Sequence, residues 1–276
     1  LYNPNWGWQS GKKRSSRIID SFDPTAILTW LYKGTKTTVN TSAALRWTNY
    51  RQSALQYYKA LDPNPTYYRY LPSYYEEGSD QYDLYRNLWE SKNPEFTQIN
   101  WDNLYRINHL NNVENENLSA ADKKGSSYIM ENRHSNLFSF LMGSYVNHRL
   151  NDNFSLQGGI NLNYSKASYY KTVRDLMGGE FWTDIDPFSD RDITIAPDNL
   201  QNDLDNPNRR VYEGDRFGYY YNFFYLNATA WLQNTYTSAH WDANYGLEMS
   251  YTQYYRKGHM RNGRAPENSL GKSGTL

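Results

Sequence analysis

The sequence predicts an all-β protein, a transmembrane antiparallel up-and-down sheet that is a segment of a β-barrel with long extracellular loops. Three observations predict this fold class. Apolar and polar residues alternate over long stretches, as they do in strands with two different faces. Short polar turns alternate with long connections along the chain. The chain is rich in aromatic residues, with 28 Tyr, 9 Trp and 10 Phe, and Tyr and Trp gather at membrane interfaces.

The clearest alternation covers residues 154–165. Its apolar face would carry Phe154, Leu156, Gly158, Ile160, Leu162 and Tyr164, whereas the positions between them are Ser, Gln, Gly or Asn. The same alternation recurs at 38–47, from Val39 to Trp47, and at 241–252, from Trp241 to Tyr251. A tilted strand needs about 9–11 residues to cross a membrane, and an average soluble strand has about five or six. The lengths therefore favour membrane-spanning strands.

Each of these strands has an expected hairpin partner directly before it in the sequence. The partners are 26–32, 137–146 and 226–233, and the turns between partners are short and polar, at 33–36, 149–153 and 236–238. We therefore expect about six antiparallel strands. The polar side chains Arg46, Lys166, Asp242 and Glu248 are expected to face a wet lumen.

The remaining connections, about 52–126 and 172–215, are much longer. Outer-membrane barrels combine short periplasmic turns with long extracellular loops, so we expect these two segments to be extracellular. Six strands are fewer than the about eight that close the smallest such barrels. We therefore interpret residues 1–276 as one partial β-barrel domain, cut at both ends.

Composition and motifs exclude several other classes of protein. The 29 basic and 29 acidic residues cancel, and no basic patch indicates a nucleic-acid partner. Without cysteine the chain has neither disulfides nor thiolate metal sites. No apolar run approaches the ~18 residues of a spanning helix. The five His are scattered, and neither a G-x-S-x-G elbow nor a P-loop occurs, so we do not expect an enzyme.

Four stretches carry a resemblance to a known family. They are 3–14 (Asn-Pro-Asn-Trp-Gly-Trp-Gln-Ser-Gly-Lys-Lys-Arg), 67–75 (Tyr-Tyr-Arg-Tyr-Leu-Pro-Ser-Tyr-Tyr), 178–186 (Gly-Gly-Glu-Phe-Trp-Thr-Asp-Ile-Asp) and 260–268 (Met-Arg-Asn-Gly-Arg-Ala-Pro-Glu-Asn). Together they resemble the TonB-dependent outer-membrane receptors of Bacteroidetes-type bacteria, and the likeness extends over nearly the whole chain. The stretches identify no substrate.

The resemblance implies a barrel of about 22 strands with a plug domain inside it. Ligand would bind the extracellular loops and the plug, and a periplasmic TonB protein would pull on the plug to drive uptake. The chain itself shows no plug and no TonB-contacting segment, so it would correspond to an early part of the barrel. The implied location is the bacterial outer membrane, with outer-membrane lipid and a surface lipoprotein as further partners. Glycans, peptides and metal chelates all remain open as the nutrient.

The first long loop is dense in aromatic rings, which stack on sugar faces or on apolar ligands. We hypothesise that these rings form a ligand mouth, although they would also pack the loop against itself. The candidate binding residues are Tyr67, Tyr68, Tyr70, Tyr74, Tyr75, Trp89 and Trp101.

Four carboxylates, Asp184, Asp186, Asp190 and Asp192, lie within nine positions of the second long loop. Calcium prefers several such oxygens, so the cluster is a candidate calcium site. The spacing lacks the Gly and Glu of an EF-hand, and a solvated acidic loop is the alternative. No other cofactor is expected.

A second function remains open. A soluble, aromatic-rich β-sandwich that binds carbohydrate at the cell surface would also contain alternating strands. It would bury their apolar faces against each other, whereas a membrane barrel would present one apolar band of about 25 Å outward. A plain porin, open and without energy coupling, is a third alternative.

Overall fold

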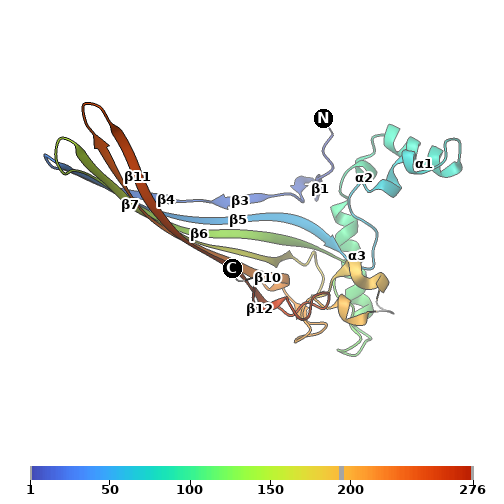
Figure 1. The fold of residues 1–276 in the computed structure, drawn as a ribbon. Coiled ribbons are helices and arrows are strands. Elements are labelled where there is room, and N and C mark those ends of the chain that lie inside the picture. The colour runs from blue at the N-terminus through green and yellow to red at the C-terminus, as the bar shows by residue number, and fades with distance from the viewer. Residues whose placement is uncertain (1, 193–195, 275–276) are drawn as a thin grey trace.

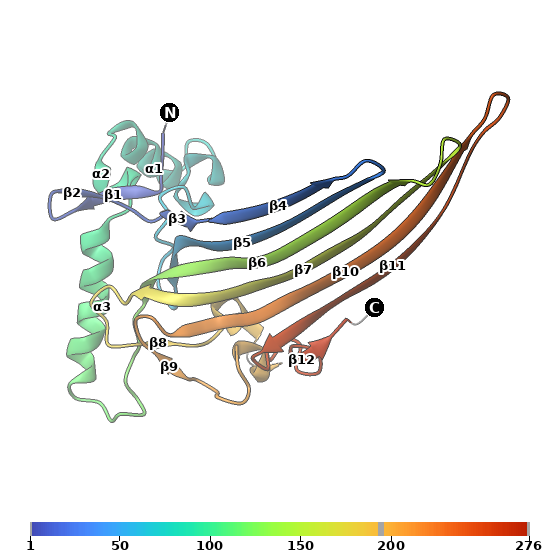
Figure 2. The ribbon, with the colours of Figure 1, turned by 90° about the vertical axis from the view of Figure 1, so that its left-hand side faces the viewer.

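The computed structural model describes residues 2–192 and 196–274, with backbone alone at 190–192. The chain folds mainly as antiparallel β-sheet. One long, curved sheet extends across the molecule, its hairpin turns lie at one end, and all helices lie at the other (Figures 1 and 2). The molecule is therefore divided into a helix-free sheet region and a helical loop end.

Six long strands form the sheet. They are β4 Thr25–Lys33, β5 Thr37–Tyr57, β6 Tyr128–Arg149, β7 Phe154–Asp175, β10 Arg216–Thr237 and β11 Asp242–His259. The short strands β3 Ile19–Phe22 and β12 Leu270–Ser273 extend its edges, giving the order β12-β11-β10-β7-β6-β5-β3, and β4 also pairs with β5. All six predicted strands and their antiparallel hairpins are confirmed. The sheet is open in the described chain.

The long strands extend well past their predicted ends. β5 has 21 residues, and β6, β7 and β10 have 22 each. The connections therefore shrink to 58–127 and 176–215. Beyond Trp47 and Tyr164 the apolar alternation stops, because both faces there carry polar and aromatic side chains, while the backbone ladder continues. Hydrophobic periodicity alone therefore underestimates these strands.

The register joins the predicted apolar faces into one surface. Ile160 is paired with Ser144 on β6 and with Ala230 on β10, and Ala230 is paired with Met249 on β11. Paired residues point to the same side of a sheet. We call this surface the apolar face; it comprises Leu28, Trp30, Tyr32, Val39, Ala43, Leu45, Trp47, Phe138, Phe140, Met142, Val146, Phe154, Leu156, Ile160, Leu162, Tyr164, Leu226, Ala230, Leu232, Leu247, Met249 and Tyr251.

The opposite side of the sheet is mainly polar. Arg46, Asp242 and Glu248 lie on it as expected, together with the Ser, Gln and Asn side chains of 155–165. Apolar side chains such as Trp231 and Leu141 are interspersed among them. The expectation for Lys166 was wrong: it pairs with Phe138 and Phe224, so it lies on the same side as the apolar face.

The first long connection is not an irregular loop, because it contains three helices. They are α1 Asp80–Glu90, α2 Pro94–Thr97 and α3 Trp101–Asn115, with 3-10 turns η1 Tyr68–Tyr70 and η2 Pro72–Tyr74 before them. Ser79, Asn93 and Asn100 cap the three N-termini, since each side chain accepts a hydrogen bond from a backbone N–H of the first turn. No helix in the described part of the chain is long and apolar enough to cross a bilayer.

The second long connection contains a small two-stranded antiparallel sheet, β8 Trp182–Thr183 with β9 Arg210–Val211, and the 3-10 segments η3 Pro187–Asp192 and η4 Pro197–Leu200. At the N-terminal end, β1 Trp6–Gln9 pairs with β2 Lys12–Ser15. Arg14 of β2 lies 4.3 Å over the Trp101 ring and forms a 2.5 Å ion pair with Asp175 at the end of β7. Arg14 thereby connects the N-terminal hairpin, α3 and the sheet.

Among the described residues, the hydrophobic core lies at the helical loop end. One cluster combines Ile99, Trp101 and Leu104 with Tyr128, Met130 and Met177. A second combines Ile129, Val173, Leu176, Trp182, Val211 and Phe217. No large apolar side chain of the apolar face is buried in the described chain. The strands along this face are therefore held by their backbone ladder and cross-strand contacts, without a covering layer.

Candidate functional site

A continuous cluster of rings covers the helical end of the molecule. Tyr75 stacks on Tyr85 of α1 with 5.1 Å between ring centroids and 9° between planes, and Tyr70 stacks on the same ring at 6.5 Å. Phe96 of α2 contacts Tyr85 and Trp89 at 6.0 and 5.7 Å. Because these rings come from η1, the end of η2, α1 and α2, their contacts fix the four short elements against one another. We call this group the ring cluster.

A cavity of about 580 Å³ lies directly beneath the ring cluster. Tyr70, Tyr85 and Phe96 form its aromatic wall, and Leu104 and Ile107 of α3 form an aliphatic wall. Its polar groups include Asp62, Asn64, Glu95, Gln98, Asn100 and Asn103. Flat rings next to carboxylate and amide groups are a common lining for sites that bind sugars or other polar organic ligands.

Asp62 organises the polar side of this cavity. Its carboxylate accepts hydrogen bonds from the Tyr57 hydroxyl at 3.0 Å and from the Asn64 N–H at 2.8 Å. The Tyr70 hydroxyl donates to the Asp62 carbonyl at 3.1 Å. Burial, and then the negative charge of Asp62, raise the pKa of Tyr70 to about 12. The Tyr70 hydroxyl therefore stays protonated at neutral pH, with its hydrogen donated to the Asp62 carbonyl.

The structure brings most of the predicted binding rings together. Tyr67, Tyr68, Tyr70, Tyr74 and Tyr75 form consecutive contacts with centroid separations of 4.6–5.4 Å. Trp89 lies at the edge of the cluster, and its Nε1 donates to the Tyr70 carbonyl at 2.8 Å. Of these rings only Tyr70 lines the cavity, while Tyr68 and Tyr74 remain about half exposed on its outside.

Trp101 has a different environment from the other predicted rings. It has no exposed surface, packs in the first core cluster, and donates from Nε1 to the Arg14 carbonyl at 3.1 Å. In this structure Trp101 supports the loop and does not face a ligand. Sequence reasoning did not single out Asp62 or Phe96, and it left Tyr85 among the rings of the loop without choosing it as a candidate binding residue. The caps at Ser79 and Asn93 would have placed Tyr85 and Phe96 on helices.

The acidic segment is held by arginines. The buried Asp184 carboxylate lies 2.6 Å from Arg209 and also accepts from Asn202 at 2.9 Å and from the Gly218 N–H at 2.8 Å. Asp186 pairs with Arg264 at 3.1 Å. The side chains of Asp190 and Asp192 lie outside the described residues. Within the described part of the chain no cluster of metal-ligating side chains occurs, and calcium binding stays a prediction that a bound-metal assay tests.

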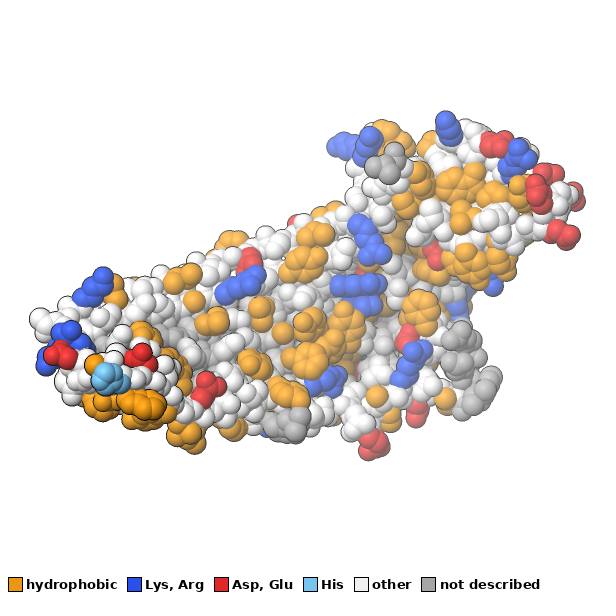
Figure 3. Space-filling model, turned by 45° about the horizontal axis from the view of Figure 1, so that its top comes forward, with side chains coloured by type: hydrophobic (Ala, Val, Ile, Leu, Met, Phe, Trp, Pro, Cys, Tyr) orange, Lys and Arg blue, Asp and Glu red, His pale blue; other side chains and the backbone are white. Residues whose placement is uncertain are grey.

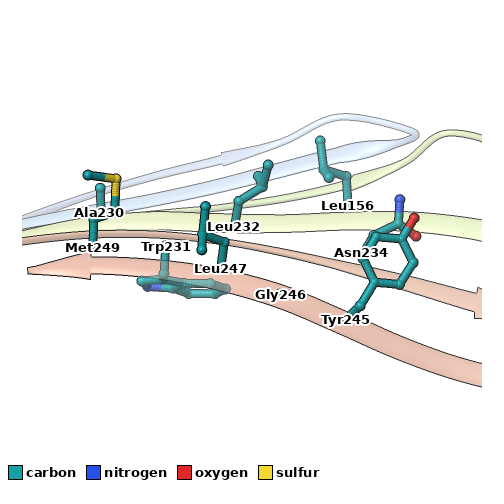
Figure 4. Close-up of a pocket in the computed structure, with 9 residues that line it drawn as sticks. All are labelled: Leu156, Ala230, Trp231, Leu232, Asn234, Tyr245, Gly246, Leu247 and Met249. Carbon is teal, nitrogen blue, oxygen red and sulfur yellow. The ribbon is translucent and has the colours of Figure 1, made fainter.

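A separate hollow of about 510 Å³ lies on the sheet, at the β10–β11 hairpin. In Figure 4, Leu156, Leu232 and Leu247 project to one side of the strands and Trp231 to the other, as the register requires. The hollow is a gap between neighbouring side chains of the apolar face. It has few polar groups to orient a soluble ligand, so we regard the cavity beneath the ring cluster as the candidate ligand site.

Comparison with known proteins gives no match: neither a family model, nor a curated protein, nor a solved structure is similar to this chain.

Proposed function

We propose that this chain forms part of the wall of an outer-membrane β-barrel that takes up a nutrient. The observation that carries the proposal is the uncovered apolar face. Leu247 and Met249 are 71% and 72% exposed, and Trp30 is 57% exposed. Apolar side chains also lie over both the sheet and the helical end in Figure 3. An apolar surface this extensive marks a contact with lipid or with another protein.

The dimensions of the apolar face support lipid as that contact. On β7 the face extends from Phe154 to Tyr164, which is about 33 Å along a strand. With the tilt of about 45° typical of membrane strands, this corresponds to about 23 Å of height, close to the ~25 Å apolar band of outer-membrane barrels. The aromatic residues at its two limits are in the positions of interfacial girdles.

The arrangement favours a barrel over the soluble β-sandwich. A sandwich needs a second sheet packed about 10 Å away on the apolar face. Within the described chain no second sheet covers this face, and the two core clusters lie beyond its end, among the loops. In a barrel, the open edges at β3–β4 and β11–β12 would pair with further strands.

The resemblance of the four sequence stretches to TonB-dependent receptors supports the more specific proposal that the chain belongs to such a receptor. In that proposal the helical end is extracellular, because the short turns lie at the opposite end of the sheet (Figure 2). The cavity beneath the ring cluster would contact the nutrient, and a plug outside this chain would connect the site to periplasmic TonB. A surface lipoprotein would be a further partner. This function requires no catalysis by the chain.

Replacing Tyr85 with Ala tests the ligand site. The chain in detergent is titrated with a panel of oligosaccharides, oligopeptides and iron chelates, and binding is followed calorimetrically. For the class that binds, we expect Tyr85→Ala to weaken affinity by up to about tenfold, since one aromatic contact contributes about 0.5–1.5 kcal/mol.

Tyr74→Ala is the matched control, because the Tyr74 ring contacts Tyr75 of the ring cluster but lies outside the cavity. It should retain affinity within about twofold. A loss in Tyr74→Ala without a loss in Tyr85→Ala would place the ligand on the outer rings instead. The absence of binding by every class would contradict a ligand site at this end of the chain.

A further inference from the structure

Basic side chains begin directly beyond the aromatic limit of the apolar face. Lys166 follows Tyr164 by two positions on β7, so both project to the same side of the sheet. Its paired neighbours there are Phe138 and Phe224, and its ammonium lies 5.7 Å from the Phe224 ring. A cation next to an apolar band, on its outward side, is positioned at the level of lipid headgroups.

Three more cations lie on the same side of the neighbouring strands. Lys257 of β11 pairs with Asn222, and Lys272 of β12 pairs with Lys257. Arg216 of β10 pairs with Thr172 of β7 after a local shift in register. We call Lys166, Arg216, Lys257 and Lys272 the basic stripe.

Aromatic rings hold two members of the basic stripe in place. The Arg216 guanidinium lies 4.7 Å from the Tyr170 ring and 4.4 Å from the Tyr220 ring, and Lys272 lies 4.3 Å from the Tyr255 ring. Such contacts position a cation without neutralising its charge. The hydroxyl groups of these tyrosines add hydrogen-bonding groups beside the charges.

The charge of the basic stripe is not compensated by an ion pair within the described part of the chain. None of its four side chains forms an ion pair with a described residue, whereas Arg51, on the same side of β5, pairs with Asp20 at 2.9 Å. At the other end of the apolar face, next to the short turns, the six long strands carry no Lys or Arg on this side. The positive charge is therefore confined to the loop end.

We propose that the basic stripe binds the phosphate groups of an anionic glycolipid in the outer leaflet of the membrane. This inference rests on the proposed membrane function. Lys166 and Thr172, the partner of Arg216, are separated by about 20 Å along β7, or about 14 Å of height at a 45° tilt. A phospholipid headgroup layer is about 5–8 Å thick. The stripe is taller than that layer, so its dimensions fit a larger headgroup built from sugar and phosphate.

The test uses the chain in detergent with bisphosphorylated lipid A as the probe, and counts bound lipid by phosphate analysis after gel filtration. A variant with Lys166→Gln, Arg216→Gln, Lys257→Gln and Lys272→Gln should bind at least about tenfold more weakly, since each cation near an anionic surface contributes about a fivefold factor. The matched control carries Lys12→Gln, Lys33→Gln, Lys36→Gln and Lys92→Gln, at four exposed lysines outside the stripe. It should bind lipid A like the unmodified chain.

Unchanged binding by the fourfold stripe variant, or an equal loss in the control, would overturn the proposal. The proposal would also be overturned if lipid A without its phosphates, or phosphatidylglycerol, bound as well as bisphosphorylated lipid A. Displacement of bound lipid A by inorganic phosphate alone would overturn it too. Circular dichroism verifies that each variant keeps its β-structure, and if the fourfold variant misfolds, single Lys257→Gln and Lys272→Gln changes should each weaken binding about fivefold. A chain without detergent-dependent β-structure would contradict the membrane function itself, which is a separate outcome.

Discussion

Replacing Met249 with Arg should destabilise the sheet in its proposed membrane-inserted form by up to about 2–4 kcal/mol, the cost of Arg or Lys at the midplane of outer-membrane barrels, which decreases toward the interfaces. Met249 is paired with Ala230, which is paired with Ile160, between the aromatic limits at Phe154 and Tyr164. The substitution therefore places a charge inside the expected apolar band of the bilayer. Denaturant titration in lipid vesicles, followed by circular dichroism, measures the change.

The adjacent position provides the control. Ser250 pairs with Thr229 on the polar side of the same strand, so Ser250→Arg would place the same charge in the wet lumen of the proposed barrel. We expect it to change stability by less than about 1 kcal/mol. Equal destabilisation by the two variants would show that the two sides of β11 have the same surroundings, which the proposed arrangement does not allow.

Replacing Asn108 with Ala should destabilise the helical end by about 2–4 kcal/mol. Asn108 of α3 is fully buried, and its Nδ2 donates to the carbonyls of Tyr128, Leu176 and Met177 at 2.8–3.1 Å. Its Oδ1 accepts from the N–H groups of Ser127 and Tyr128 at 2.8 and 3.1 Å. Removing the amide leaves several buried backbone groups without partners, which costs about 1–3 kcal/mol for each group that water does not reach.

Hydrogen–deuterium exchange over 101–130 reports this change, because α3 is anchored to the start of β6 and the end of β7 through that amide. Asn112 lies one turn later and forms a single hydrogen bond, to the Gly178 carbonyl at 2.8 Å. Asn112→Ala should therefore leave exchange nearly unchanged. If the two variants exchange alike, the Asn108 network does not hold the helix.

Sequence reasoning succeeded where one physical factor dominated. Between the aromatic limits each long strand has one apolar side, so a period of two is visible at 154–165 and 241–252, and the strands were predicted correctly. Beyond those limits both sides of the strands carry polar and aromatic side chains, so the predicted strands end earlier than the observed ones. Lys166 was assigned to the lumen because it is charged, although its position in the alternation already placed it beside Tyr164.

The candidate ligand site was less predictable because it depends on contacts between distant segments. Tyr67 to Tyr75 could be recognised from ring density alone. Trp101 could not be separated from them, since its burial depends on Arg14 and Met130. No pattern in the sequence around Asp62 marks it as a polar group of the cavity, because its role follows from its position next to Tyr57 and Tyr70. Ser79, Asn93 and Asn100 are residue types that often cap helix N-termini, so they could have indicated the three helices. A search for alternating apolar residues does not detect such caps.

The most direct test of the central claim, that the apolar face contacts lipid, is membrane partition of the expressed chain. Membranes are fractionated and extracted with and without detergent, and circular dichroism is recorded on the extracted material. We predict that the chain is extracted only with detergent and that its β-structure depends on that detergent. A monodisperse monomer that folds cooperatively without detergent would contradict the claim, and would favour a soluble fold in which the apolar face is covered.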